Sequence, residues 1–146
     1  MKKIINKIKQ NKGAVSVEAA LVCLLIFPIF ISLIVGGYCW STAQSTNVNI
    51  NFETGRYVST VGCNYSKLNA SMPSLTKYEG YEIIVNDKQL TSMSGSNGKI
   101  VISCPVESTR GSEFEVTTIY PVFSSAIYNL FPATVVRSGI YVQEAD

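Results

Sequence analysis

The longest apolar stretch of the chain runs from Ala14 to Trp40 and contains a single charged residue, Glu18. A helix made of the twenty residues from Ala19 to Tyr38 would be about 30 Å long, which matches the hydrocarbon core of a bilayer. The pattern therefore predicts a transmembrane helix over residues 14–40. A buried helix of a soluble protein is the weakest alternative, because no other part of the chain could cover so much apolar surface.

The second half of the chain alternates apolar and polar positions, which is typical of strands with one buried face. The alternation predicts strands over residues 81–85, 99–106, 113–120 and 134–143, with a short extended segment at 89–93. Short turns between these segments favour an antiparallel meander. In the last strand, one face carries Val136, Ile140 and Val142.

A short amphipathic helix is expected between Pro121 and Pro132, because apolar residues recur there at helical spacing. It could pack on the sheet or present an exposed apolar surface. The fold class expected is therefore α+β: a long N-terminal transmembrane helix, then a small antiparallel β-sheet domain with a short helix near the C-terminus.

The segment between the membrane helix and the strands allows two interpretations. Residues 41–60 could continue the helix as a stem, which we favour, or form an extended linker that becomes a strand. Residues 60–78 contain glycine, asparagine, proline and several serines, which indicates an irregular loop. The domain organisation predicted is a leader at 1–13, a transmembrane helix at 14–40, a stem or linker at 41–60 and an outer β-rich domain at 61–146.

Charge is distributed unevenly along the chain. There are 12 Lys and Arg residues against 10 Asp and Glu, but five of the lysines and none of the acids lie in the first 13 residues. Lysines before a membrane segment keep that end in the cytoplasm. The rest of the chain is therefore acidic and is predicted to be extracytoplasmic, and the basic charge indicates membrane topology and not nucleic-acid binding.

Glu18 needs a compensating interaction, because a carboxylate inside a membrane segment costs about 2.5 to 3.5 kcal/mol. Cleavage after Gly13 would make Ala14 a free ammonium group four residues before Glu18, on the same face of a helix. The helix N-terminus would also favour the carboxylate. Between neighbouring copies, the ammonium group of one subunit could neutralise Glu18 of the next.

The arrangement Lys12-Gly13, Ala14 and Glu18 resembles the processing site of type IV prepilins, and residues 13–22, GAVSVEAALV, are most similar to TadE-like pseudopilins of tight-adherence (Tad, or Flp) pilus systems. The resemblance implies a minor pilin in the cell membrane of a prokaryote, cleaved between Gly13 and Ala14 by a prepilin peptidase and held in register by Glu18. The implied partners are the lipid bilayer, other pilins or pseudopilins and the pilus assembly platform.

Other hypotheses remain open at this point. The helix could be an uncleaved anchor in which Glu18 lies near the interface, and the protein could then be a single-pass envelope binding or adhesion module. It could also be a secretory signal cleaved near Ser41-Thr42-Ala43, although its apolar run exceeds the usual core of about 7 to 15 residues.

Four cysteines are divided between the membrane segment and the outer part. Cys23 lies inside the apolar run and Cys39 at its outer edge. Cys63 and Cys104 could form a disulfide in an oxidising exterior, with Cys39–Cys63 as the competing pairing and reduced thiols as a third alternative.

The sequence lacks the groups that most enzymes use. It contains no histidine, which removes the commonest general base and metal ligand, and it has neither a CxxC pair nor a glycine-rich phosphate loop. We therefore expect no enzymatic activity, no cofactor, no metal site and no nucleic-acid partner.

Overall fold

The computed structural model describes residues 2–90, 97–122 and 131–144. Its first element is the helix α1, Lys2–Val61, which contains Pro28 and continues through the whole 41–60 segment. The helix ends at Val61. The next residue, Gly62, has a φ of 97°, in the left-handed region that favours glycine, and its N–H donates to the carbonyl of Val58. A small sheet and a short helix follow, so the predicted α+β class is confirmed.

Two compact units divide the chain. Of the described residues, one unit comprises 2–38 with Phe131, and the other comprises 39–90, 97–122 and 132–144. Helix α1 contributes to both, because its residues 39–61 belong to the unit that contains the sheet. We call this second unit the outer domain.

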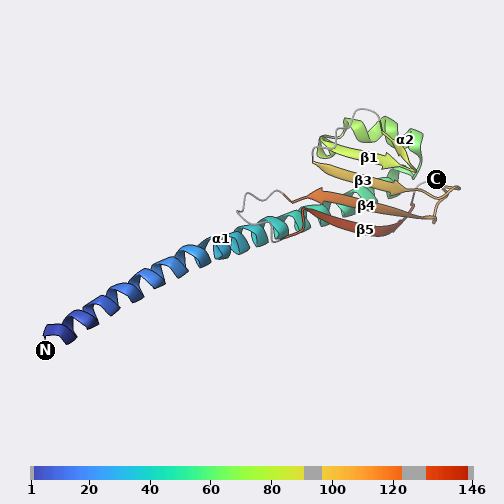
Figure 1. The fold of residues 1–146 in the computed structure, drawn as a ribbon. Helices are drawn as coiled ribbons and strands as arrows, with labels where there is room; N and C mark the ends of the chain where they lie inside the picture. Colours follow the sequence, from blue (N-terminus) through green and yellow to red (C-terminus); the bar gives the residue numbers. More distant parts are fainter. Residues whose placement is uncertain (1, 91–96, 123–130, 145–146) are drawn as a thin grey trace. The chain divides into compact units, whose positions relative to one another are not determined.

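The outer domain is built on a five-stranded sheet with the order β2-β1-β3-β4-β5 (Figure 1). Its strands are β1 (Tyr81–Val85), β2 (Lys88–Gln89), β3 (Gly98–Ser103), β4 (Glu113–Pro121) and β5 (Thr134–Val142). The bounds of β1, β4 and β5 agree with the predicted segments to within one residue. Strand β3 ends three residues earlier than predicted, and β2 shares only Gln89 with the predicted segment 89–93, of which residues 91–93 lie outside the described residues. The fourth and fifth strands pair over nine residues each, which makes them the longest ladder of the sheet.

One strand pairing differs from the predicted antiparallel meander. Strands β1 and β2 form a hairpin whose turn residues Asn86 and Asp87 both have positive φ, as a tight hairpin turn requires. The chain then returns to the beginning of β1, where the N–H of Asn97 donates to the carbonyl of Gly80. Strand β3 therefore runs parallel to β1, and the sheet is mixed.

The predicted loop at 60–78 is wrong over part of its length, because it contains the helix α2, Tyr65–Ser71, and two short 3-10 turns, η1 (Met72–Ser74) and η2 (Thr76–Tyr78). Asn64 caps α2 by accepting a hydrogen bond from the N–H of Ser66 at 2.9 Å. The helix predicted between Pro121 and Pro132 lies almost entirely outside the described residues.

A single hydrophobic core joins the sheet, the end of α1 and the segment with α2. The inward faces of β1, β3 and β4 contribute residues that are almost completely buried, and the segment between α1 and β1 adds others of the same kind. The fully buried apolar side chains among the described residues are Val58, Leu68, Met72, Tyr78, Ile83, Val85, Leu90, Ile100, Ile102 and Val116. This core fixes the outer domain onto the last turns of α1.

Candidate functional site

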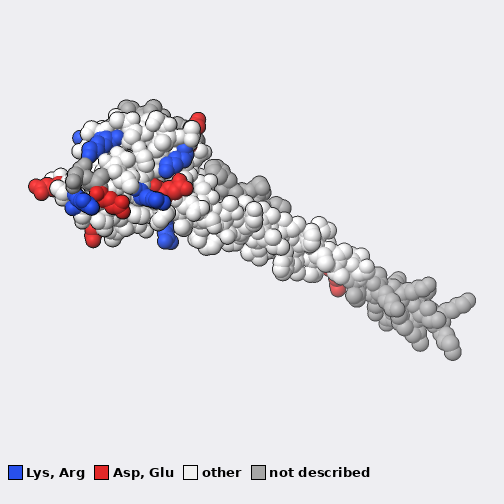
Figure 2. Space-filling model, turned by 180° about the vertical axis from the view of Figure 1, so that it is seen from behind, with Lys and Arg blue, Asp and Glu red and all other residues white. Residues whose placement is uncertain are grey.

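Between Val17 and Tyr38, helix α1 exposes an apolar surface in which Glu18 is the one charged side chain. Large apolar side chains on every face of this segment are exposed, including Phe27 at 68% and Ile34 at 70%. Within the described residues, α1 is the one helix long and apolar enough to cross a membrane. Figure 2 shows most of the described helix surface without charge, whereas Lys, Arg, Asp and Glu gather over the outer domain.

The residues of the predicted processing site lie on α1. Gly13 and Ala14 are part of the helix, and Glu18 follows one turn later with its side chain exposed. Glu18 is therefore available to a group on another molecule. A shallow apolar groove beside Pro28 lies further along the same helix, lined by Ala20, Cys23, Leu24, Phe27, Pro28 and Ile31.

A second feature of α1 is a row of small and polar residues that faces β4 and β5. The row repeats every four residues, so it lies on one helix face, and each member is buried: Ala43, Asn47, Asn51, Gly55 and Ser59. We call it the polar row. The Asn47 amide donates to the carbonyl of Val135 at 3.0 Å.

Asn51 makes the most hydrogen bonds of the polar row. Its amide nitrogen donates to the carbonyls of Val116 at 2.8 Å and Arg137 at 3.2 Å, and its amide oxygen accepts from the Tyr141 hydroxyl at 2.7 Å. Asn51 is 2% exposed. One side chain thus joins the helix to two neighbouring strands through uncharged hydrogen bonds in a buried site, where each is expensive to lose.

The end of α1 is fixed to the end of β5 by Ser59. Its hydroxyl donates to the carbonyl of Val142, and its own carbonyl accepts from the N–H of Glu144 at 2.9 Å. The row was not predicted, because asparagines on a helix usually indicate a solvated face. Its four-residue spacing, with Ala43 and Gly55 in the same register, is the signal that could have revealed it.

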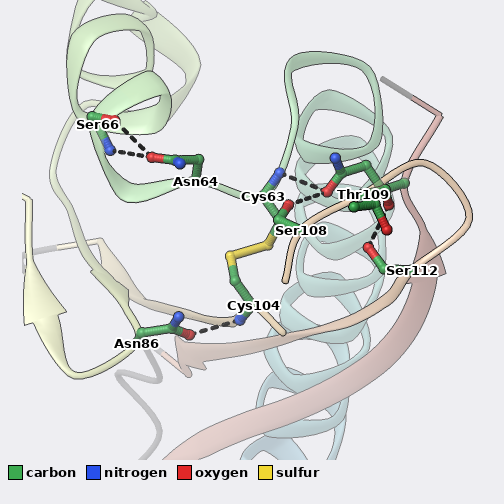
Figure 3. Close-up of a disulfide and its surroundings, with 9 residues drawn as sticks. Cys63, Asn64, Ser66, Asn86, Cys104, Ser108, Thr109 and Ser112 are labelled. Carbon is green, nitrogen blue, oxygen red and sulfur yellow. Dashed lines mark hydrogen bonds between the residues drawn. A yellow bond between two sulfur atoms is a disulfide. The ribbon is translucent and has the colours of Figure 1, made fainter. Parts of the chain in front are cut away.

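Cys63 and Cys104 form a disulfide, with Cα atoms 5.5 Å apart (Figure 3). Of the two pairings left open by the sequence, this is the one in the structure, and Cys23 and Cys39 are free thiols. The N–H of Cys63 donates to the Gln143 side chain at 3.1 Å, and the N–H of Cys104 donates to the Asn86 side chain at 2.7 Å. The bond therefore joins the end of α1 to the chain leaving β3.

Tyr78 is a phenol buried in the core of the outer domain. Burial raises the pKa of Tyr78 to about 12, while the neighbouring Thr54 hydroxyl acts in the opposite direction. The ring also makes an edge contact with Tyr57 at 6.2 Å between centroids, and the ammonium nitrogen of Lys77 lies 5.0 Å from its centroid. A phenol with this pKa stays protonated at neutral pH, so Tyr78 acts as a core residue.

Strand β5 has an open edge and an exposed apolar face. The N–H of Gln143 donates to the carbonyl of Ser112, and the N–H of Val122 donates to the carbonyl of Ala133. These two bonds show that the odd-numbered residues of β5 are the ones whose backbone groups bond to β4. In an antiparallel ladder the bonded pairs alternate, so the backbone groups of Val136, Ser138 and Ile140 point away from β4. No strand of the described chain pairs with that edge.

The side chains on the outer face of β5 are also exposed. Val136 is 59% and Ile140 is 71% exposed, on the sheet face opposite to the polar row. The sequence placed Val136, Ile140 and Val142 on a common face, and the structure shows that this face is turned away from the core, because Gly139 and Tyr141 occupy the inward positions beside Asn51.

Searches against protein-family models, curated proteins and solved structures found no match. Within the described ranges, no group of three or more His, Cys, Asp or Glu side chains could hold a metal ion.

Proposed function

We propose that this chain is a membrane-anchored minor pilin, or pseudopilin, of TadE-like type that takes part in the assembly of a Tad or type IV-like pilus. In this proposal a prepilin peptidase removes residues 1–13, the apolar part of α1 holds the subunit in the cell membrane of a prokaryote, and the outer domain is extracytoplasmic. The role is structural and not enzymatic.

The main observation behind the proposal is the charge of Glu18. It is the one charged side chain between Ala14 and Trp40, and it is exposed. Glu18 lies at the N-terminal end of the span, beside the lipid chains, where an ionisable side chain usually pairs with an opposite charge, so its presence calls for a positive partner. A new ammonium group at Ala14 of a neighbouring subunit supplies that charge and at the same time fixes the axial register between the two helices.

The polar row is consistent with a subunit that is pulled out of the membrane through its helix. Buried hydrogen bonds from Asn47, Asn51 and Ser59 attach residues 39–61 of α1 to β4 and β5. A force that extracts the helix from the membrane is thereby distributed over two strands and the core. A simple tether needs no such attachment.

The open edge and outer face of β5 support contact with a neighbouring pilin subunit. Unpaired strand backbone is complemented by another extended segment, and natural proteins usually protect a long apolar edge with charge, proline or a covering element. In β5 the outward positions 134, 136, 138 and 140 are Thr, Val, Ser and Ile, which include neither charge nor proline.

N-terminal sequencing of the protein expressed with a prepilin peptidase tests the processing step. We expect a mature chain that begins at Ala14, and a chain that begins at Met1 or after residue 43 would contradict the proposal. Replacement of Gly13 by Ala provides the control, since an intact leader should then remain in most molecules.

The Glu18→Ala variant separates a pilin from a single-pass adhesion module. In a pilin the variant should insert in the membrane normally but fail to join the pilus or its assembly complex, while Glu18→Asp keeps part of the activity. An adhesion module would retain its surface binding after Glu18→Ala.

A further inference from the structure

Phe131 lies on the apolar helix at a place where two glycines leave room for it. A Cβ atom on Gly36 would be 2.7 Å from Cδ2 of the Phe131 ring, and one on Gly37 would be 3.5 Å from its Cζ. Phe131 is half-buried, and Gly36 is buried. The ring therefore occupies the space that side chains at these two positions would take.

The depth of this contact follows from the helix. If the twenty residues from Ala19 to Tyr38 span the hydrocarbon core, Gly36 lies about 11 Å from its centre, inside the outer boundary at about 15 Å. The neighbouring side chains Ile34 and Tyr38 are exposed at 70% and 74%, so lipid surrounds the remainder of this turn. Phe131 must share that depth.

The chain around Phe131 has the composition that such a position requires. From Val122 to Phe131 there is no charged residue, and Pro132 follows directly. Insertion of a phenylalanine side chain into the hydrocarbon region is favourable, and tryptophan is enriched at its boundary with the headgroups, where Trp40 follows the same turn of α1. A phenylalanine at this level gains contact with lipid as well as with the helix.

We propose that Phe131, three residues before β5, inserts into the outer leaflet of the bilayer and forms a second membrane contact beside α1. The ligand of this surface is the acyl-chain region next to the headgroups. The inference rests on the proposed membrane anchorage of α1 and adds to it an apolar contact from a part of the chain more than ninety residues later.

Depth-dependent quenching of tryptophan fluorescence tests this proposal in the full-length protein reconstituted in phosphatidylcholine vesicles. The chain has one tryptophan, Trp40, which is first replaced by Phe, and Phe131→Trp then provides the probe. We expect loss of emission in vesicles brominated at an upper acyl-chain carbon, a smaller loss with bromine near the chain ends, and little quenching by acrylamide in the water.

Two reference variants in the same background make the outcome specific. Phe27→Trp lies near the middle of the span and should be quenched most by bromine near the chain ends, whereas Val106→Trp, at a fully exposed position of the outer domain, should be quenched by acrylamide alone. If the Phe27→Trp variant is not quenched by any brominated lipid, the proposed anchorage itself fails. If the Phe27→Trp variant is quenched and the Phe131→Trp variant is not, the anchorage stands and the present inference is wrong.

Because the indole ring is larger than the phenyl ring that packs on Gly36, a second probe of different shape is used. The depth is then measured with a nitroxide on Phe131→Cys in a chain that also carries Cys23→Ser and Cys39→Ser. Collision with oxygen in preference to a water-soluble nickel chelate supports insertion, and the reverse preference contradicts it.

Discussion

The ring of Tyr141 lies directly against the backbone of Gly55, so that a Cβ atom at residue 55 would be 2.3 Å from ring carbons Cε1 and Cζ. The contact lets the Tyr141 hydroxyl reach the amide oxygen of Asn51, one turn earlier on the helix, at 2.7 Å. The same ring stacks on Phe114 of β4 with 5.8 Å between centroids. Because Gly55 has no side chain, the aromatic ring of Tyr141 in β5 can pack directly against helix α1.

Gly55→Ala should destabilise the outer domain by about 1 to 3 kcal/mol, because the added methyl group displaces the Tyr141 ring. Helix propensity by itself would make the alanine variant more stable by about 1 kcal/mol. A decrease in the free energy of unfolding therefore indicates the packing effect, and an increase indicates helix propensity. Thermal unfolding of the full-length protein in detergent measures the change. In a chain that carries Tyr141→Ala, the same Gly55→Ala substitution should be neutral or stabilising, and an unchanged penalty would contradict this explanation.

Asn51→Leu should lower the free energy of unfolding by about 1 to 3 kcal/mol. It removes the amide that bonds to the carbonyls of Val116 and Arg137, and it leaves the part-buried Tyr141 hydroxyl without its acceptor. Asn49→Leu is the matched control. It makes the same chemical change on an exposed position of the same helix, where surface substitutions stay within about 0.5 kcal/mol. Equal changes in the free energy of unfolding for the two variants would show that the hydrogen bonds of Asn51 do not stabilise the outer domain.

The strands were predictable because their inward faces are uniformly apolar. Ile100 and Ile102 in β3, and Phe114 and Val116 in β4, lie at alternate positions of their strands, and all four are buried. A local pattern therefore sufficed for these elements. The parallel pairing of β1 with β3 could not be predicted in this way, since it depends on which edge of β1 the returning chain meets.

Two other features depend on contacts between distant residues. The buried amides of Asn47 and Asn51 have the composition of a solvated helix face, and only β4 and β5 make that face an interior one. The short helix α2 is anchored by the Asn64 cap and by burial of Leu68, which is too little periodicity to identify it within a serine-rich segment. Glu18 is the opposite case, because the role we propose for it was predicted from the sequence and depends on another molecule.

Loss of the Cys63–Cys104 disulfide should destabilise the outer domain by about 4 kcal/mol, the chain-entropy value for the 41-residue separation of the two cysteines. The variant with both residues changed to alanine, and the wild type treated with a reductant, should show the same lowered unfolding temperature. Replacement of Cys23 and Cys39 by serine should leave the outer domain unaffected. A reductant without effect on the wild type would contradict the prediction.

Alkaline pH should destabilise the outer domain through Tyr78. Its folded pKa is raised to about 12, above the ordinary value of 10.0, so the unfolded state loses the phenolic proton first. The resulting stability is fully present below pH 10 and is lost as the pH rises towards 12, by up to about 3 kcal/mol. Chemical unfolding at a series of pH values measures this loss, which Tyr78→Phe should reduce. Burial also raises the pKa of Tyr81 and Tyr141, so a smaller loss should remain.

A charge introduced on the outer face of β5 should impair assembly and leave the folding stability of the subunit nearly unchanged. Ile140 is 71% exposed and lies outside the hydrophobic core, so Ile140→Lys should change the free energy of unfolding by no more than about 0.5 kcal/mol. The lysine should nevertheless weaken contact with a neighbouring subunit, because its charge would have to be buried against another apolar strand. Recovery of the variant in sheared pili, or co-purification with the assembly complex, measures this effect.

Val106→Lys is the control for this last prediction, since it places the same charge on a fully exposed valine of the β3–β4 connection. The Val106→Lys variant should have the free energy of unfolding of the wild type and should assemble normally. Loss of assembly in both variants would indicate a general effect of charge, and normal assembly of Ile140→Lys would exclude the outer face of β5 from the subunit contact.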